Sequence, residues 1–445
     1  MLLVTLGCCL ILGGCSGDGR EPNRKYSPAE LRADMRQAKA MIQRLHPKTF
    51  APFADVAKAF ERQAALIQDS MTAPEFIRLL APAVSPIKCG HTRLWLDDIS
   101  ERYLEDSGRF LPFDGRIVND TLVVTEVYQG RSRLSANDIV ISLNGLPFSG
   151  ALRRAKSCLW ADGSAEGYKT WEFNQRFRWY YRLLVDHSDE FEIVSYSFED
   201  EDYDTILVPA VPLEQDLPPT EEDEIFPMGE FDHWVSFSIS DDSAVCGLDV
   251  NFFDYFDNDE HFKGTLDRFF ERYANEGCQS LILDLRDNDG GSPEPAAYVL
   301  QYLLPKPFIY FQGYGAGAYP ALGREIQPTV INHFEGDLYV LIDEGCFSTT
   351  GHLLSLLRQQ GRGTFIGTTS SGSWVCNGGY VERDLNNTGI GMLIPRKNFA
   401  TTARGLPFGE GIAPDIEIKR SVADFIAGRD VVRDSAMALA RRESD

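Results

Sequence analysis

The stretch LILDLRDNDGGSPEP, residues 281–295, decides how the C-terminal half of this chain folds. It is an apolar run that ends in polar residues and two adjacent glycines, after which Ser292 and Pro293 are typical helix starters. Gly290 and Gly291 allow backbone N–H groups to approach a ligand closely, and at a helix N-terminus such groups face an anion. The stretch predicts a strand-turn-helix unit whose turn is either a plain connection or an oxyanion hole.

Two other kinds of site do not fit this turn. A calcium loop would require oxygen ligands where Leu285 and Ala296 stand. A phosphate-binding P-loop would require Gly-Lys-Ser or Gly-Lys-Thr, and neither follows. Further apolar runs, AVCGLDVNFF, DLYVLIDEG and GTFIGTT, alternate with segments of helical spacing. This alternation predicts parallel βαβ units over residues 231–420.

A hydroxyl cluster occupies the next strand-to-helix turn, in LYVLIDEGCFSTTGHLLSLL. Ser348 is either the N-cap of the helix that follows or a nucleophile at the positive end of that helix. In the second case the N–H of Thr349 points at developing negative charge. Cys346 is an alternative nucleophile, but its apolar flanks favour a small buried side chain.

A serine nucleophile needs a base, and histidine is the usual one. His91, in CGHTRL, follows a glycine at the edge of a predicted strand, where its ring could stand clear. His352 lies one turn after Ser348 on the same helix, points back along that helix and is not expected to reach the hydroxyl. The remaining histidines have no hydroxyl motif nearby: His46, His187, His233, His261 and His333. Glu410, between two glycines, is either a turn residue or the carboxylate that orients the imidazole.

Composition limits the class of protein. The 445 residues are enough for two or three domains, and 43% hydrophobic residues with 24% charged ones are typical of a globular protein. The net charge of -23 repels polyphosphate, so nucleic acid is excluded as a partner. No apolar run after the first residues is long enough to span a bilayer.

Residues 1–15, MLLVTLGCCLILGGC, are predicted to be a cleaved signal peptide. LGGC resembles the lipobox of bacterial lipoproteins, in which the cysteine, here Cys15, carries lipid and is the first mature residue. A truncated N-terminal anchor is the other interpretation. The six later cysteines are scattered without a CxxC pair, so the spacing gives no zinc motif.

The region before the βαβ units has three parts. Residues 16–105 are helical up to a strand containing GHT, and their first helix has the start signals Ser27, Pro28 and Glu30. Residues 106–211 are β-rich, with a hairpin at Asn119-Asp120. Within them LSANDIVISLNGLPFSGAL resembles a segment of PDZ domains, which bind extended peptides by strand addition. Residues 212–230 are predicted to be an acidic, Pro-rich linker, and residues 421–445 a helical tail.

The order of these segments resembles peptidase family S41. LILDLRDNDGG is similar to the family's DLR-N-GG strand and turn, and EGCFSTTGHLLSLLRQQGRGTFIGTTSSG to its nucleophile block, with Ser348 at the nucleophile. GIAPDIEI and DFIAGRDVVRDSAMAL are similar to its closing segments. LHPKTF and CGHTRL resemble the tricorn-like bacterial branch, in which a histidine of the GHT region, here His91, and a later glutamate, here Glu410, complete the site.

Some positions depart from the family pattern. The processing-protease branch uses a Ser–Lys pair, but Ser373 stands where that lysine would be, and Lys397 lies in a different strand-like stretch. Tricorn has a serine where this chain has Gly90, and the family's glutamate after the nucleophile is Gly351 here. Catalysis is therefore expected to use an imidazole, with a rate that falls as pH drops through the range near pH 6.5.

These inferences predict an α/β multidomain fold, with a crotonase/ClpP-like core after a helical segment and a PDZ-like module. The expected function is an exported serine peptidase in which Ser348, His91 and Glu410 act with an oxyanion hole from Gly290, Gly291 and Thr349. The expected location is the cell envelope, lipid-anchored, and the expected partners are peptide or protein substrates. No metal or other cofactor is implied. The alternative is a non-catalytic peptide-binding lipoprotein. A third reading, a carbohydrate- or lipid-binding protein, is suggested only by the aromatic run YKTWEFNQRFRWYY, and such a run is more often core and hairpin packing.

Overall fold

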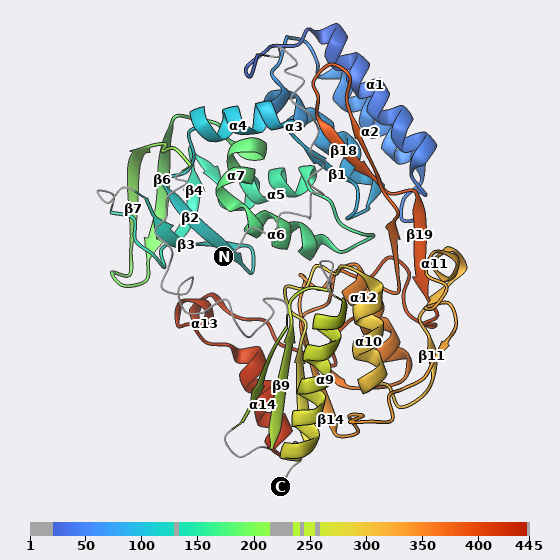
Figure 1. Cartoon of the computed structure of the whole chain (residues 1–445). Helices are drawn as coiled ribbons and strands as arrows, with labels where there is room; N and C mark the ends of the chain where they lie inside the picture. Colours follow the sequence, from blue (N-terminus) through green and yellow to red (C-terminus); the bar gives the residue numbers. More distant parts are fainter. Residues whose placement is uncertain (1–20, 129–132, 214–234, 241–243, 254–258, 443–445) are drawn as a thin grey trace.

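The structure, a computed structural model, describes residues 21–128, 133–213, 235–240, 244–253 and 259–442. The predicted signal peptide with Cys15, and the linker predicted at 212–230 apart from its first two residues, lie outside the described residues. The described chain forms two halves, seen one above the other in Figure 1. No described helix combines the length and the apolar character needed to cross a membrane.

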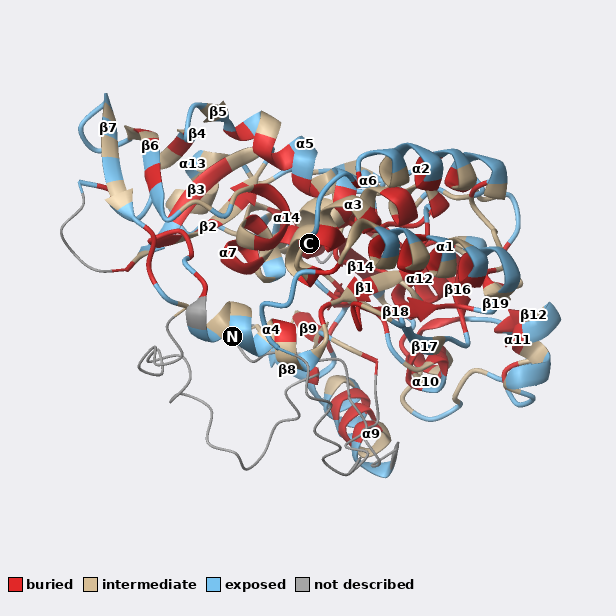
Figure 2. Ribbon diagram, turned by 90° about the horizontal axis from the view of Figure 1, so that it is seen from above, coloured by how far each residue is buried: buried red, intermediate tan, exposed pale blue. Residues whose placement is uncertain are grey.

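Three helices open the upper half: α1 (Pro28–Leu45), α2 (Phe53–Ala65) and α3 (Ala73–Val84). The predicted start of α1 is confirmed, because the Ser27 side chain accepts from the Glu30 amide and the Glu30 carboxylate accepts from the Ser27 amide. Figure 2 shows α1 and α2 with buried residues toward the interior and exposed residues toward solvent. Their apolar faces pack into one core with α3 and the β-rich region.

The β-rich region is an antiparallel sheet of order β2-β3-β4-β6-β7, with β5 paired to β4. Asn119 and Asp120 have positive φ and join β2 to β3, which confirms the predicted hairpin. The aromatic run is buried as expected, but it forms helices instead of a hairpin. The bounds are α4 (Asp98–Ser107), β2 (Phe113–Val118), β3 (Thr121–Val127), β4 (Ile139–Leu143), β5 (Leu146–Pro147), α5 (Phe148–Cys158), α6 (Glu166–Gln175), α7 (Phe177–Tyr180), the π-turn Tyr181–Val185, β6 (Glu190–Ser197) and β7 (Asp202–Pro209).

The lower half is built on a six-stranded sheet of order β20-β15-β14-β10-β9-β8. All neighbours are parallel except β8 and β9, which confirms the predicted βαβ units. Apolar residues of α9, α10 and α12 cover one face, and those of α14 cover the other. The bounds are β8 (Val235–Ile239), β9 (Val245–Val250), α9 (Asp259–Glu276), β10 (Ser280–Asp284), α10 (Pro293–Leu303), β14 (Asp337–Ile342), α12 (Thr349–Gln359), β15 (Thr364–Gly367), β20 (Ile416–Glu417), α13 (Val422–Ile426) and α14 (Val431–Arg442).

Short strands connect the two halves. Strand β1 (Arg93–Trp95), from the upper half, pairs antiparallel with β18 (Gly391–Ile394), which pairs with β17 (Val381–Asp384). The strand predicted around GHT is therefore limited to three residues, because a 3-10 turn at Ser85–Ile87 and Lys88 in the left-handed region precede it. The remaining elements are β11 (Phe308–Ile309), β12 (Phe311–Gln312), α11 (Gly313–Ala318), β13 (Glu325–Ile326), β16 (Val375–Gly378) and β19 (Lys397–Thr401).

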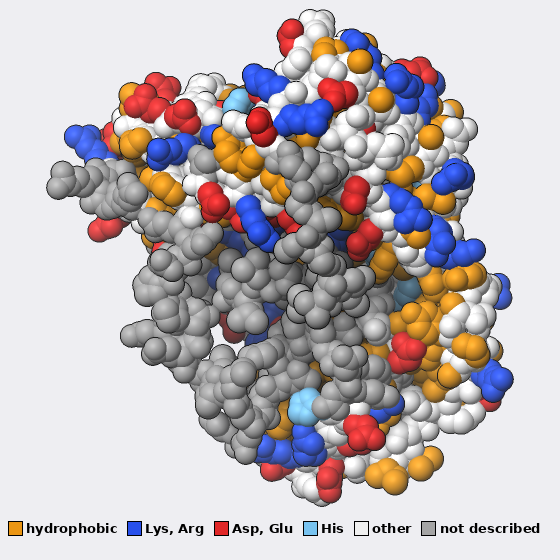
Figure 3. All heavy atoms as spheres, turned by 45° about the horizontal axis from the view of Figure 1, so that its top comes forward, with side chains coloured by type: hydrophobic (Ala, Val, Ile, Leu, Met, Phe, Trp, Pro, Cys, Tyr) orange, Lys and Arg blue, Asp and Glu red, His pale blue; other side chains and the backbone are white. Residues whose placement is uncertain are grey.

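The surface between these elements carries charges of both signs. Figure 3 shows Lys and Arg side chains intermixed with Asp and Glu over the described part of one face. A disulfide joins Cys246 in β9 to Cys278, which lies just before β10. This pair could not be assigned from the spacing of the cysteines, because six are spread over the chain after the predicted signal peptide.

Candidate active site

Ser348 lies in the turn between β14 and α12, and its backbone decides between the two roles considered for it. Its φ is 50° and its ψ is -118°, and its side chain makes no capping hydrogen bond. A capping serine has an extended backbone and accepts from an amide of the first turn. The left-handed conformation is instead the strained turn that presents a nucleophile above a helix N-terminus. Ser348 is therefore not a side-chain cap.

The hydroxyl of Ser348 meets the predicted histidine. Its Oγ lies 3.0 Å from Nε2 of His91, and the pair is partly buried. The loop that carries His91 is held by the pairing of β1 with β18, directly after it in the chain. Gly90 is required here because a Cβ would lie 2.4 Å from the Phe347 ring. Burial raises the pKa of the Cys376 thiol well above its usual range, and the Ser348 hydroxyl acts in the opposite direction.

Burial sets the protonation state of His91. Its pKa is lowered to about 3, mainly by desolvation and also by the charges of Arg93 and His352. The rings of Phe347 and Tyr380 lie on either side, with centroids 4.8 and 6.1 Å from that of His91. The imidazole is therefore neutral at neutral pH, which is the form that can accept a proton from Ser348. Activity that depends on the neutral imidazole is therefore expected to persist to a pH well below 6.5, the value near which its loss was expected from the sequence.

The structure does not bring Glu410 to His91. Glu410 is exposed, whereas Nδ1 of His91 is buried and has no hydrogen-bond partner among the described residues. Glu410 lies at a turn after Gly409, whose carbonyl accepts from the backbone and hydroxyl of Ser164. The prediction that Glu410 orients the imidazole is therefore wrong in this geometry, and Glu410 is a turn residue.

The predicted oxyanion donors divide into two groups. The amide of Gly290 donates to Oδ1 of Asn288 at 2.9 Å, so it is not available to a ligand and its assignment is wrong. The amides of Gly291 and Thr349 donate to no acceptor within the described part of the chain. Gly290 still matters, because a Cβ there would lie 2.7 Å from Cβ of Ser348. The turn thus leaves two free N–H groups beside the serine.

Asn288 fixes this turn. It is buried, and its Nδ2 donates to the carbonyl of Val250 at 2.7 Å. Its Oδ1 accepts from Thr350 at 2.6 Å in addition to Gly290, and its carbonyl accepts from the Phe347 amide at 3.0 Å. One side chain therefore ties the glycine turn to the serine turn. Its position in the turn was visible in the sequence, but its hydrogen bonds depend on three strands and could not be read there.

A second network, partly buried, joins the upper half to the same turn. Arg93 donates to the Tyr168 hydroxyl at 2.9 Å and lies 3.5 Å from Asp289. Tyr168 donates to Asp289 at 2.5 Å. Trp171, one helical turn after Tyr168 in α6, donates to Asp287 at 2.7 Å. The aromatic run therefore supports the site. This role was not predicted from the sequence, because core and hairpin packing explained the run.

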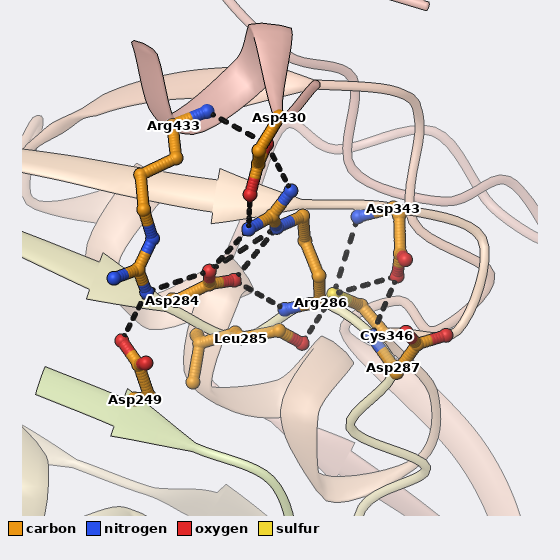
Figure 4. Close-up of polar contacts among 9 residues, drawn as sticks. All are labelled: Asp249, Asp284, Leu285, Arg286, Asp287, Asp343, Cys346, Asp430 and Arg433. Atoms are coloured by element: carbon orange, nitrogen blue, oxygen red, sulfur yellow. Dashed lines mark hydrogen bonds and ion pairs between the residues drawn. The ribbon is translucent and has the colours of Figure 1, made fainter. Parts of the chain in front are cut away.

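Cys346 is excluded as the nucleophile by its surroundings. Figure 4 shows its thiol among Leu285, Asp343 and Asp287. It is fully buried and donates to the carbonyl of Leu285 at 2.9 Å. Burial raises the pKa of this thiol well above its usual range. Cys346 is therefore a packed, unreactive thiol, as its apolar flanks indicated.

Figure 4 also shows what holds the C-terminal tail on the sheet. Arg286 forms ion pairs with Asp284 at 2.6 Å and with Asp430 at 2.8 Å. Arg433, in α14, pairs with Asp249 at 2.5 Å and with Asp284 at 3.1 Å. The arginine of the DLR segment is therefore a structural residue. It fixes the start of α14 rather than lining the site.

The other candidate bases lie elsewhere. The ring of His352 is buried against Phe311, with centroids 5.4 Å apart. Ser373, at the position of the family's lysine, is buried and donates to the carbonyl of Val375 at 3.1 Å. A side chain at Gly351 would lie 2.3 Å from the carbonyl carbon of Gly372, which leaves no room for a glutamate. His91 is thus the base that this geometry offers.

Known proteins resemble this arrangement. The model described as Peptidase family S41 matches residues 248–418. Tricorn protease of Thermoplasma acidophilum is 28% identical over 176 residues, which are 39% of this chain and only 15% of tricorn protease. Mature CPAF has a similar structure, with a TM-score of 0.64 at 13% identity, covering 90% of this chain and 94% of CPAF. Mature CPAF complexed with lactacystin gives 0.66 at 12% identity, covering 94% and 98%.

The structural likeness to CPAF extends over both halves and establishes the fold, while the family match lies in the lower half. The matched residues contain the glycine turn after β10 and the turn between β14 and α12 that carries Ser348. Both turns belong to the site described above. Members of this family are serine proteases. Through residues 248–418, the chain is similar to peptidase family S41.

Proposed function

We propose that this chain is a serine peptidase in which Ser348 is the nucleophile and His91 the base. The observation that carries the proposal is the 3.0 Å contact between Ser348 Oγ and His91 Nε2. It is made by a serine with positive φ whose side chain makes no capping hydrogen bond. Ser348 Oγ attacks the peptide carbonyl, and its proton passes to Nε2 and then to the leaving amine. The N–H groups of Gly291 and Thr349 stabilise the oxyanion.

Within the described part of the chain, no carboxylate accepts a hydrogen bond from Nδ1 of the imidazole, and this has a consequence for the rate. When Nε2 accepts the serine proton, the second ring proton must sit on Nδ1, which has no acceptor among the described residues. The imidazolium formed is then stabilised less than in a Ser–His–Asp triad, where loss of the carboxylate's role costs about 10⁴-fold in kcat. We therefore expect slow turnover.

Hydrolysis of an unstructured protein tests the proposal. Wild type should cut it, and Ser348→Ala should lose at least about 10³-fold while keeping its thermal melting point. The control is Ser157→Ala, because this exposed hydroxyl bonds only to the carbonyl of Arg154 and lies near Cys158, outside the site. Equal cleavage by wild type and Ser348→Ala would overturn the peptidase proposal.

A non-catalytic peptide-binding protein is the second candidate. The observation that favours it is the same unpartnered Nδ1 of His91 together with the exposure of Glu410. In that case wild type and Ser348→Ala would bind a fluorescent unstructured peptide equally, and neither would cleave it. Binding followed by cleavage in wild type alone selects the peptidase.

We also propose that the chain is exported to the cell envelope and anchored through lipid on Cys15. The lipobox-like LGGC supports this, and so does the disulfide between Cys246 and Cys278, since disulfides persist in oxidising compartments. Mass spectrometry of the mature N-terminus should find a lipid-modified Cys15. An intact Met1, or cleavage to an unmodified residue, would contradict the anchor.

Protein substrates are proposed to dock on the PDZ-like sheet by strand addition. Strand β7 is an edge of that sheet, and it exposes Tyr203 and Leu207. Replacing both by serine should raise KM for an unfolded protein several-fold and leave KM for a short peptide unchanged. An unchanged KM for both substrates would remove β7 as the docking edge.

A further inference from the structure

A mixed cluster of ligand-type side chains lies directly behind His91. Cys89 and His91 come from the loop before β1, and Asp162 comes from the turn after α5. One ligand atom of each residue, a thiol sulfur, a ring nitrogen and a carboxylate oxygen, lies within 4.8 Å of the other two. The cluster joins two distant parts of the chain, since Asp162 lies 72 residues after Gly90, the residue between Cys89 and His91.

Two atoms of this cluster are buried without partners. Nδ1 of His91 and Oδ2 of Asp162 have no hydrogen-bond partner among the described residues. His91 is only 9% exposed and Asp162 only 5%. Nε2 of His91 contacts Ser348, so Nδ1 is the nitrogen left for the cluster. Buried polar atoms are rarely left unsatisfied, and these two belong to side chains of the same cluster.

The remaining atoms of the cluster are held in place. Oδ1 of Asp162 accepts from the Gly90 amide at 2.7 Å. The sulfur of Cys89 accepts from Nδ2 of Asn377 at 3.3 Å. Outer partners of this kind fix the orientation of metal ligands and tune their affinity. The Ser348 hydroxyl plays the same part for the outer nitrogen of His91.

The donor set indicates the ion. Thiolate sulfur with imidazole nitrogen is typical of zinc sites, whereas magnesium and calcium take oxygen ligands. Zinc bonds of about 2.0–2.3 Å place tetrahedral ligands roughly 3.5 Å apart. A cluster already within 4.8 Å reaches that spacing by small side-chain rotations.

We propose that Cys89, His91 and Asp162 form a Zn²⁺ site that switches the peptidase off; the inhibitory part rests on the proposed function. Zinc on Nδ1 of His91 leaves the single ring proton on Nε2. That nitrogen then donates to Ser348 and cannot accept its proton, although the two residues need not move apart. Zinc binding releases the thiol proton of Cys89 to solvent. Removal of the ion returns the ring proton to Nδ1 and frees Nε2.

Cobalt provides a direct test of binding that does not depend on activity. Titrating Co²⁺ into the wild-type protein should produce one equivalent of a thiolate-to-cobalt absorption band, which Zn²⁺ abolishes by displacement. Cys158→Ser is the matched control, because Cys158 is also a buried free thiol but lies outside the cluster. It should keep the band, Cys89→Ser should lose it, and Asp162→Asn should weaken binding at least tenfold. No band in wild type, or an unchanged band in Cys89→Ser, would overturn the proposal.

Inhibition is measured separately, as the ratio of rates with and without Zn²⁺ within each variant. A fluorophosphonate probe should label wild type and Cys158→Ser at least tenfold more slowly with zinc, and a chelator should restore the rate. In Cys89→Ser the ratio should be near one. Equal inhibition of Cys89→Ser would overturn the switch. A protein that binds cobalt but never reacts with the probe would refute the peptidase and leave the metal site standing.

Discussion

Ser348 Oγ lies 3.0 Å from His91 Nε2 although 257 residues separate them in the chain. The serine belongs to the parallel sheet of the lower half, and the histidine belongs to the helical upper half. Their meeting depends on the pairing of β1 with β18 and on the contacts of Arg93 with Tyr168 and Asp289. The site is therefore complete only when both halves are folded together.

His91→Ala is expected to lose activity as completely as Ser348→Ala, and the double variant no more than either, because members of such a unit are not additive. The measurement is kcat/KM on an unstructured protein. Lys397→Ala is the control that tests the Ser–Lys mechanism. This lysine lies over the Tyr314 ring, 4.9 Å from its centroid, and should be dispensable. A fully active His91→Ala, or an inert Lys397→Ala, would show that His91 is not the base.

Glu410→Ala is expected to change kcat/KM by less than about twofold. The side chain is exposed and is not hydrogen-bonded to His91. Substitutions at exposed positions usually change the free energy of unfolding by no more than about 0.5 kcal/mol, so the fold should be kept. The resemblance to tricorn-like enzymes predicts the opposite, a large loss, since it makes this glutamate the partner of the base. A loss of 100-fold or more, with the melting point unchanged, would show that Glu410 reaches His91 during catalysis.

Gly90→Ala is expected to destabilise the protein by about 1–3 kcal/mol, a typical cost of overpacking, and to lower activity at temperatures where it stays folded. The added methyl would meet the ring of Phe347, which itself contacts His91. Gly317→Ala is the matched control, because nothing lies within 4 Å of its Cβ position. Chemical denaturation of both variants checks the difference, and equal stability would contradict the described packing.

The pH dependence follows from the burial of His91. Its base form persists down to a pKa of about 3, so the acid limb of kcat/KM should lie below pH 5 rather than near pH 6.5. As the pH is lowered, folding stability begins to fall at a higher pH than the acid limb of kcat/KM. His46, His91 and His352 all have lowered pKa values, about 4, 3 and 4.

Below pH 6.5 the unfolded chain binds protons that the folded chain does not, so each of these histidines removes up to about 1.4 kcal/mol of stability per pH unit. Denaturation at each pH therefore accompanies the kinetic profile. An acid limb at pH 6.5 in a protein that is fully folded there would contradict the buried, neutral His91.

The sequence predicted those elements whose signals are local. Ser27 and Glu30 mark a helix start through groups three residues apart, and Asn119 with Asp120 forms a tight turn that needs positive φ. The alternation of apolar runs with segments of helical spacing is also a local signal, and it predicted the parallel sheet. Ser348 was placed correctly in a strand-to-helix turn, but its role could be decided only by its backbone angles.

The parts that could not be predicted depend on contacts between distant segments. Asp162 reaches Gly90 across the two parts of the upper half, and no local pattern marks it. The Gly290 amide was expected to be free, but Asn288 accepts from it. Core and hairpin packing was expected for the aromatic run, but Tyr168 and Phe173 lie on helix α6 and are buried by tertiary packing.

The central claim is that His91 activates Ser348, and the rate of covalent labelling tests it most directly. The measurement is the second-order rate of adduct formation with a fluorophosphonate, followed by intact mass and assigned by peptide mapping. The account predicts one adduct on Ser348 in the wild type and at least a hundredfold slower labelling in His91→Ala. An adduct on any other residue, or equal rates in the wild type and His91→Ala, would contradict it.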